Sequence, residues 1–456
     1  MDLPKGWEAI NIDTLFHIVG GGTPSTIKTD YWDETGTPWF SSADISDNGE
    51  ITSRRHVTGL GVENSTTNIV PAGSVIVVTR VGLGKVAILK KEMCFSQDNQ
   101  ALIPMAPETL HNRYVFYCLY NTMQTMKYSG RGTTISGITK KQLADYPFPL
   151  PSLAEQHRIV AKIDALFSKL DKGVETLQTI RQQLKTYRQA VLKWAFDNTT
   201  FEKHSLKKVS IAFGGAAFKS SDFLSEGKYQ VVKIGNVRPG VVRLWEKPAF
   251  IDSIDGYERY LLQKCDVIIT LTGTRKKRDY GFSAIITQEN LLLNQRVAAI
   301  RFSKEYLPKF FMYYSWTKTF QDDFFADETG NVGQGNVGMK AITETLVPYC
   351  SLEEQAQIVA AIESRLSICD KLESIVDESL AKAAALRQSI LKKAFAGQLV
   401  PQDPDDEPAE MLLKRIKAGT PRHSTTDPCG STPSEKTART MPLSGKGANA
   451  KREVCP

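Results

Sequence analysis

A long helix-forming segment occurs twice in this chain at a fixed spacing. Ser152-Leu-Ala-Glu-Gln156 returns as Ser351-Leu-Glu-Glu-Gln355, and Arg188-Gln-Ala-Val-Leu192 returns as Arg387-Gln-Ser-Ile-Leu391, each 199 residues later. Because the offset is the same at both ends of the segment, no net insertion or deletion separates the two copies. Length was kept while side chains changed, so the fold must contain two long elements of equal length.

Both copies are predicted to form one uninterrupted helix. Each opens with Ser-x-x-Glu, at Ser152 with Glu155 and at Ser351 with Glu354, a capping box that satisfies free amides at a helix start. Neither copy contains proline, and Gly173 is the only glycine within them. At about 1.5 Å per residue such a helix is about 65 Å long, too long to lie inside one small domain.

Apolar residues in each copy recur at alternating steps of four and three, which is typical of a coiled-coil seam. The first seam comprises Ile159, Ile163, Leu166, Leu170, Gly173, Leu177, Ile180, Leu184, Tyr187, Val191 and Trp194. The second comprises Ile358, Ile362, Arg365, Cys369, Leu372, Val376, Ser379, Ala383, Leu386, Ile390 and Lys393. The second seam is more polar, so we expect it to share its surface with another subunit. The two helices are predicted to pack together as a spacer between two modules.

The segments preceding the two helices repeat the same features in looser form. Gly20-Gly21 corresponds to Gly214-Gly215, and Ser74–Val78 corresponds to Asp266–Thr270. The offset between such features slides between about 192 and 199, so the modules accepted insertions that the helices did not. In the first module we expect strands at Trp39–Ile45, Gly73–Arg80 and Ala101–Pro104 and a helix at 114–126, which make a mixed α/β domain.

Composition places the chain among ordinary globular proteins. Its 456 residues suggest two or three domains, and its net charge of +7 is compatible with a polyanionic partner without demonstrating one. Seven scattered cysteines without a Cys-x-x-Cys pair argue against a disulfide framework and a zinc site. No apolar signal or membrane-length stretch is visible, so we expect a cytoplasmic protein.

Recognisable catalytic motifs are missing from the sequence. Gly84-Lys85 fails the phosphate-loop pattern because Thr79 and Val86 occupy required positions, and no Asp/Asn-Pro-Pro-Tyr/Phe motif is found for an extruded amino base. The six histidines lack the spacing of a metal-binding pair. No catalytic or metal-ligating residue is therefore predicted.

Several motifs together resemble the specificity (S) subunit of Type I restriction-modification systems. They are the opening Leu3-Pro-Lys-Gly-Trp7, Pro149–Ile159 and its echo Val347–Gln355, the Arg-Gln-x-x-Leu-Lys-x-Ala-Phe endings, the strand and loop at 73–82, Gly132–Lys140 and Gln398–Pro408. The likeness runs in the family's order over residues 1 to about 417.

This resemblance implies two target-recognition domains held apart by two long helices that pack as an antiparallel coiled coil. Each domain would read one half of a bipartite double-stranded DNA target, and the helices would set the unread spacer. Two methyltransferase (M) subunits and restriction (R) subunits would supply the chemistry. The chain itself would bind no cofactor, because S-adenosylmethionine, ATP and Mg would belong to those partners.

The expected boundaries follow from the repeat and the resemblance. Residues 1–150 and 201–347 are the two recognition domains, 151–200 and 348–400 the two spacer helices, 401–418 a short helical segment, and 419–456 a disordered tail rich in Ser, Thr, Pro, Gly and Lys.

Residues that read DNA should be cations that contact phosphate and polar side chains that reach base edges. In the first module the candidates are Arg54, Arg55, Arg80, Arg131, Thr133 and Thr134. In the second they are Lys219, Arg275, Lys276, Lys277, Arg278, Gln334 and Asn336. Asn99-Gln100 and Asn294-Gln295, which lie beside predicted strands, are expected to have structural roles.

Other interpretations stay open on sequence alone. The chain could be an orphan or exchangeable S subunit without its own restriction partner, or a coiled-coil scaffold without a DNA role. An enzyme in its own right would have to show activity as the isolated chain.

Overall fold

The chain folds into two compact units in the computed structural model, which describes residues 3–129, 137–197, 201–331 and 333–419. Unit 1 comprises residues 1–160 and 395–456, and unit 2 comprises residues 161–394. Both units mix helices and strands, and two long helices are present, so the predicted fold class is confirmed. From residue 420 onward, the predicted disordered tail lies outside the described residues.

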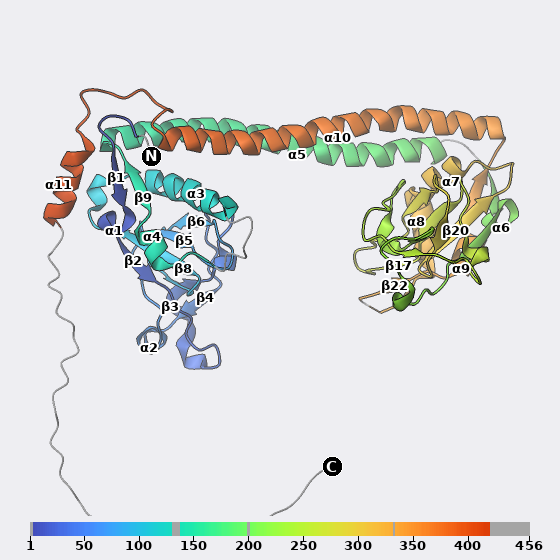
Figure 1. Ribbon diagram of the computed structural model, residues 1–456, viewed down its shortest axis with the longest axis horizontal. Helices are drawn as coiled ribbons and strands as arrows, with labels where there is room; N and C mark the ends of the chain where they lie inside the picture. The colour runs from blue at the N-terminus through green and yellow to red at the C-terminus, as the bar shows by residue number, and fades with distance from the viewer. Residues whose placement is uncertain (1–2, 130–136, 198–200, 332, 420–456) are drawn as a thin grey trace, which may run out of the picture. The chain divides into compact units, whose positions relative to one another are not determined.

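The two duplicated segments form α5 (Leu153–Asp197) and α10 (Leu352–Phe395), of 45 and 44 residues. Each is therefore about 66 Å long at about 1.5 Å per residue. The two helices run side by side (Figure 1). Gly173 does not break α5, and no heavy atom lies within 4 Å of where its Cβ would be.

Ion pairs within unit 2 show that α5 and α10 are antiparallel. In an antiparallel pair one residue number falls as the other rises, so the numbers of facing residues have a constant sum. Three cross-helix pairs share the sum 558: Arg188–Asp370, Arg181–Asp377 and Asp171–Arg387. The register is therefore the same at three separate points along the helices.

The 199-residue repeat makes this register symmetrical. Arg387 is the second copy of Arg188, and Asp370 is the second copy of Asp171, so one Arg–Asp pair occurs at two equivalent positions. Arg188 also reaches Glu373 at 3.0 Å. Burial opposes its charge, but the hydrogen bonds that Arg188 donates to Glu373 and Asp370 outweigh this effect and raise its pKa.

The heptad seam is only partly covered. Ile163 and Leu184 are buried, whereas Tyr187 is 47% and Trp194 is 44% exposed. The guanidinium of Arg365 lies 4.1 Å from the centre of the Trp194 ring, which partly shields that indole. On α10, Leu386 remains 50% exposed. The sharing of this surface with another subunit stays a prediction.

The two units contain the same three sheets with the same strand order. The four-stranded sheet of unit 1 contains, in order, β2 (Phe16–Gly20), β8 (Asn99–Pro104), β5 (Val75–Val78) and β6 (Val86–Ile88). Its three-stranded sheet contains β4 (Arg55–Val57), β3 (Trp32–Phe40) and β7 (Cys94–Phe95). Its two-stranded sheet pairs β1 (Glu8–Asn11) with β9 (Pro147–Leu150). The four-stranded sheet of unit 2 contains, in order, β11 (Ser210–Gly214), β20 (Val297–Phe302), β16 (Val267–Thr270) and β18 (Ser283–Ile285). Its three-stranded sheet contains β15 (Phe250–Ile251), β12 (Tyr229–Val232) and β19 (Leu291–Leu293). Its two-stranded sheet pairs β10 (Glu202–Ser205) with β23 (Leu346–Tyr349). The duplication inferred from the sequence therefore extends to the topology of both modules.

Unit 2 has two further small sheets. They are the hairpin of β13 (Val237–Arg238) with β14 (Val241–Val242), and β17 (Thr272–Gly273), β22 (Gly335–Asn336) and β21 (Thr329–Gly330) in that order. The shorter helices of unit 1 are α1 (Ile12–Leu15), α2 (Gly59–Glu63), α3 (Asn112–Ser129), α4 (Lys140–Ala144) and α11 (Ala409–Gly419). Those of unit 2 are α6 (Leu206–Val209), α7 (Pro308–Ser315), α8 (Lys318–Ala326) and α9 (Met339–Glu344).

The strands β5 and β16 of the two four-stranded sheets are buried along their whole length. In β16, alternate side chains point to opposite sides: Ile268 packs with the three-stranded sheet, and Val267 and Ile269 pack with the aromatic helix α7. The same core includes Leu192 of α5 and Ile362 of α10. The long helices are therefore part of the hydrophobic core of unit 2 rather than an appendage to it.

A buried glutamine in the first turn of each long helix anchors that helix to its unit. In unit 1, Gln156 Oε1 accepts a hydrogen bond from the His111 amide at 2.9 Å. In unit 2, Gln355 accepts one from the Leu307 amide at 2.8 Å, and its Nε2 donates to the carbonyls of Glu305 and Cys350 at 3.1 and 2.9 Å. Both side chains are 0% exposed, which explains why Glu-Gln recurs in both copies.

The two predicted capping boxes differ. Ser351 and Glu354 form the complete box, with both reciprocal hydrogen bonds. In the first copy Ser152 accepts from the Glu155 amide, but the Glu155 carboxylate instead accepts from Trp7 Nε1 at 2.9 Å. The first box is thus only half formed. Burial raises the pKa of the Glu155 carboxyl, against the opposing effect of the Trp7 hydrogen bond.

The segment after α10 is held against the start of α5. Asp406 accepts two hydrogen bonds from Arg158, at 3.1 and 2.6 Å, and one from the Ser152 hydroxyl at 2.8 Å. The Arg158 hydrogen bond lowers the pKa of Asp406. The adjacent α11 confirms the short helix expected after the second spacer.

One strand expectation is wrong in its bounds. The strand expected at 39–45 is the end of β3, which stops at Phe40, and Ser42–Asp44 form a 3₁₀ turn. Asp44 caps this turn by accepting from the amide and hydroxyl of Ser41. Local side-chain hydrogen bonds therefore end the strand earlier than expected.

We expect Gln355→Ala to destabilise unit 2 by about 2–3 kcal/mol, because the substitution leaves buried backbone groups without partners. Urea unfolding followed by circular dichroism measures this as a lower midpoint. Gln357, which is exposed on the same turn, provides the control: Gln357→Ala should change stability by less than about 0.5 kcal/mol. Equal effects of the two variants would contradict the anchoring role.

We expect Asp406→Asn to cost about 1 kcal/mol at pH 7, since the partly exposed Arg158 pair loses its charge. A lowered folded-state pKa means that this stability is present above the unfolded value of about 3.9 and disappears as the pH falls through the folded value. Urea midpoints of wild type and variant should therefore begin to approach each other as the pH falls toward about 3.9, and should converge only below the folded-state pKa of Asp406. Asp405→Asn, at an exposed neighbour, should show no difference at any pH.

Candidate nucleic-acid interface

In unit 1 the loop after β5 meets the segment before α4, and in unit 2 the loop after β16 meets the segment before α9. The Ile138 amide donates to the Thr79 carbonyl at 2.7 Å in unit 1, and the Val337 amide donates to the Leu271 carbonyl at 2.9 Å in unit 2. Ile138 and Val337 are 199 residues apart. The structure thus joins two candidate regions that the sequence analysis had treated separately, and it does so twice.

In unit 1 this junction presents Arg80. Its side chain is 59% exposed and lies 3.9 Å from Asp98, and the next residue, Val81, is 70% exposed. A Cβ at Gly137 would lie 3.1 Å from Arg80 Cγ, so the segment before α4 lies directly against this arginine. The other candidates of that segment, Arg131, Thr133 and Thr134, lie outside the described residues.

Arg54 and Arg55 lie on a different sheet of unit 1, at the start of β4. Arg54 is 79% exposed and pairs loosely with Asp44 at 3.7 Å. The Arg55 guanidinium lies 5.4 Å from the centre of the Trp32 ring. Both are available to solvent, and their role in contacting DNA stays a prediction.

In unit 2 the basic run 274–279 forms a closed turn. Asp279 accepts hydrogen bonds from the amide of Thr274, at 2.6 Å, and from its hydroxyl. Arg275 does not project freely: its guanidinium contacts the Glu328 carboxylate at 3.3 Å and the Gly330 carbonyl at 3.3 Å. The turn is therefore tied to the strand β21.

The remaining members of the run differ in their surroundings. Lys276 and Lys277 are exposed, whereas the Arg278 guanidinium lies 4.9 Å from the centre of the Phe325 ring. Arg278 has a φ of 47°, a left-handed conformation that costs a non-glycine residue about 1 kcal/mol or more. Gln334 and Asn336 are exposed on the neighbouring hairpin.

Lys219 lies in a separate part of unit 2. It precedes the turn Ser220–Asp222, and the flanking Phe218 and Phe223 pack on the cluster around β12 and β15. The structure therefore brings Arg275–Arg278, Gln334 and Asn336 together and places Lys219 elsewhere.

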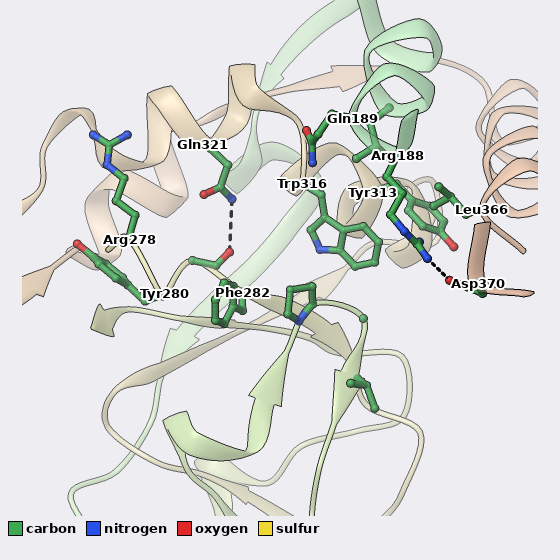
Figure 2. Close-up of a pocket in the computed structure, with 15 residues that line it drawn as sticks. Arg188, Gln189, Arg278, Tyr280, Phe282, Tyr313, Trp316, Gln321, Leu366 and Asp370 are labelled. Atoms are coloured by element: carbon green, nitrogen blue, oxygen red, sulfur yellow. Dashed lines mark hydrogen bonds and ion pairs between the residues drawn. The ribbon is translucent and has the colours of Figure 1, made fainter. Parts of the chain in front are cut away.

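A cleft of about 700 Å³ lies beside this region, within unit 2. Figure 2 shows Arg278 and Tyr280 at one end of the cleft, Arg188 with Asp370 at the other, and Trp316 between them. The Trp316 indole donates to Ser283 at 2.9 Å and packs on Gly240, so its orientation is fixed. At that end of the cleft, Arg188 is already paired with Asp370 and Glu373.

Two residues of this region were missed by sequence reasoning. The Tyr280 hydroxyl donates to the Glu328 carboxylate, and that carboxylate is only 7% exposed while it also holds Arg275. Burial and the charge of Glu328 raise the pKa of Tyr280, so the phenol keeps its proton. These partners lie 48 and 53 residues apart, and no short-range pattern signals such a contact.

The structural role expected of Asn99 is consistent with its surroundings, since it is 0% exposed and its Nδ2 donates to Ser96 at 3.0 Å. The histidines are less isolated than the sequence suggested, because the rings of His111 and His157 are 4.4 Å apart. Within the described ranges, no group of three or more His, Cys, Asp or Glu side chains could hold a metal ion. Nor is any helix there long and apolar enough to cross a membrane.

A family model and individual relatives each match more than half of this chain. The family model described as Type I restriction modification DNA specificity domain matches residues 4–186 and 198–379. The chain is 26% identical over 372 residues to the Type I restriction enzyme EcoBI specificity subunit of Escherichia coli, covering 73% of this chain and 75% of that protein. It is 28% identical over 315 residues to the Escherichia coli EcoKI specificity subunit, covering 63% and 67%.

Solved structures share the fold. A chain from a structure concerning complex assembly and conformational transition of the type I R-M system matches with a TM-score of 0.70 at 19% identity, covering 87% of this chain and all of that one. The HsdS subunit from Thermoanaerobacter tengcongensis matches with a TM-score of 0.50 at 17% identity, covering 87% and 98%.

We expect Gly335→Ala to open the hairpin of β21 and β22, because a Cβ at this position would collide with the Tyr280 hydroxyl and the Glu328 carboxylate. The cost of such overpacking is about 1–3 kcal/mol. Hydrogen exchange followed by mass spectrometry should show faster exchange in residues 333–340. Gly338→Ala is the matched control, since nothing lies within 4 Å of its Cβ position; protection lost equally in both variants would refute the proposed packing.

Proposed function

Because the chain belongs to the Type I restriction modification DNA specificity family, we propose that it reads a DNA target in two separate halves, one with each unit. The chain is a DNA sequence-specificity subunit. The observation that carries the proposal is the repetition of one fold, with the same sheet order and the same loop junction, in front of two equal helices.

In this proposal, α5 and α10 act as a ruler. Their antiparallel register is repeated by equivalent Arg–Asp pairs, so neither helix can slide along the other without breaking both pairs. A sliding step of one helical turn would also move the apolar seam residues out of contact. The number of unread base pairs between the half-sites then follows from helix length.

We further propose that two methyltransferase subunits and restriction subunits assemble on this chain. Exposed apolar residues on α10 support a protein surface there: Ile368, Leu372 and Ile375 are 57%, 41% and 57% exposed and lie at spacings of four and three on one face. The chain would perform no chemistry itself. S-adenosylmethionine, ATP and Mg would be held by the partners, and the complex would work in the cytoplasm.

Shortening both helices by one heptad tests the ruler. Residues 176–182 face 376–382, so deleting both segments removes about 10.5 Å of helix at about 1.5 Å per residue and keeps the remaining pairs in register. We expect the spacer of the methylated site to become shorter, by up to about three base pairs at about 3.4 Å per base pair.

The measurement is sequencing of methylated DNA after assembly of the full chain with its methyltransferase partners. A control variant keeps the length but replaces exposed positions of the same segments with alanine, and it should keep the wild-type spacer. An unchanged spacer in the shortened variant would falsify the ruler. Absence of site-specific methylation by the wild-type complex would instead favour a scaffold without a DNA role.

A further inference from the structure

The hairpin of β21 and β22 in unit 2 forms the exposed edge of a three-stranded sheet. Thr329 pairs with Asn336 and Gly330 pairs with Gly335, and β22 also pairs with β17 on its other side. Successive side chains of a strand point to opposite faces, so Asn336 points away from the face on which Gly335 is buried. Gln334 immediately precedes β22 and is also exposed. We call Thr329–Gly330 with Gln334–Asn336 the ribbon.

The backbone of the ribbon is held by local hydrogen bonds. The Asn331 carboxamide oxygen accepts from the amides of Gly333 and Gln334, at 3.0 and 2.9 Å, and the Thr329 hydroxyl donates to the Asn336 carbonyl at 3.1 Å. The side-chain amides of Gln334 and Asn336 make no hydrogen bond within the part of the chain that the structure describes, and both residues are exposed. The hairpin therefore offers two exposed side-chain amides.

The opposite face of the ribbon rests on a polar base. Gly335 is buried over Tyr280 and Glu328, where a Cβ would collide with both side chains. Arg275 contributes to the same base: its guanidinium donates to Glu328 and to the Gly330 carbonyl. Its charge is paired with that of Glu328, and each of its three nitrogens donates one hydrogen bond to Glu328 or Gly330, so Arg275 positions the ribbon.

The same contacts fix the basic turn beside the ribbon. Because Arg275 is bound to Glu328 and Gly330, the next two residues, Lys276 and Lys277, project from the turn and are exposed. The arrangement offers ammonium groups to phosphate and carboxamides to base edges, from one turn and one ribbon that are joined by an ion pair.

We propose that the ribbon is the base-reading element of unit 2, with Gln334 and Asn336 contacting bases in the major groove and Lys276 and Lys277 contacting phosphates. This inference rests on the proposed function and deepens it. The major groove of B-DNA admits a two-stranded ribbon, and a Gln or Asn carboxamide matches the N6 and N7 edge of adenine with two hydrogen bonds. One half-site should therefore contain adenine at the positions that this ribbon reads.

The test uses the full chain assembled with its methyltransferase partners and DNA duplexes varied at each position of both half-sites. Gln334→Ala and Asn336→Ala should each lower discrimination at one position of one half-site by roughly 5- to 150-fold and leave the other half-site unchanged. Gln288→Ala, at an exposed turn of the same unit, is the control and should leave every position unchanged.

A change of preference separates base reading from loss of folding. Glutamate accepts a hydrogen bond from the N4 amino group of cytosine, so Gln334→Glu should move the preferred base at its position from adenine toward cytosine. A misfolded variant lowers methylation at all sequences and gives no new preference.

Substitution of the two lysines should change DNA affinity and its salt dependence rather than base preference. Lys276→Gln and Lys277→Gln should weaken binding of all sequences alike and reduce the slope of log affinity against log salt by about 0.9 each. Lys264→Gln, at an exposed lysine paired with Glu289, is the control. Arg275→Gln should instead reduce base discrimination without changing the salt slope, because its charge is already neutralised by Glu328.

The proposal is overturned if the Gln334 and Asn336 variants change methylation equally at every position, or alter the half-site read by unit 1. A wild-type complex without sequence preference would mean that the proposed function itself fails. The two results can be told apart, because in the first the wild-type complex is sequence-specific and in the second it is not.

Discussion

The antiparallel pairing of α5 with α10 is the interaction on which the rest of this structure depends. Two helices of 45 and 44 residues expose long surfaces, and only a fixed register buries the same apolar residues along their length. Equivalent pairs, Arg188–Asp370 and Arg387–Asp171, set that register at two symmetric points. Partly exposed ion pairs contribute little free energy, but a shifted register would leave every one of them unmatched. Their contribution is therefore to specificity of pairing more than to stability.

The proposed ruler has a second requirement, the attachment of each helix to its own unit, because rotation of a helix relative to its unit would change the spacing. Gln156 and Gln355 meet this requirement with fully buried carboxamides that bond to backbone groups of the preceding segment. Backbone groups are present whatever the side chains, so the same glutamine can anchor two modules whose sequences have diverged. The Trp7–Glu155 hydrogen bond and the Asp406 contacts add a further attachment in unit 1.

The two units share the same core but differ in their loops, which suits sequence-specific recognition. The sheets of the two units keep one strand order, while the loops at the strand ends differ in length and chemistry. Arg80 stands at the junction in unit 1, and a clamped basic turn with a ribbon stands at the equivalent place in unit 2. Burial restrains the core side chains, whereas exposed loop residues can change without loss of stability. Two units of one fold can therefore read different bases.

The sequence alone determined the two equal helices, the duplication and the mixed α/β class, because helical periodicity, strand burial and repeat spacing are all encoded over short stretches. It could not show that the Glu155 carboxylate bonds to Trp7 instead of closing its capping box, nor that β3 ends at Phe40. Of the candidate cations, Arg275 was indistinguishable from Lys276 until the fold brought Glu328 beside it. Tertiary structure decided the contacts of Glu155 and Arg275 because each depends on a partner far away in the chain. The end of β3 depends instead on the hydrogen bonds of Ser41 with Asp44, which compete locally with continuation of the strand.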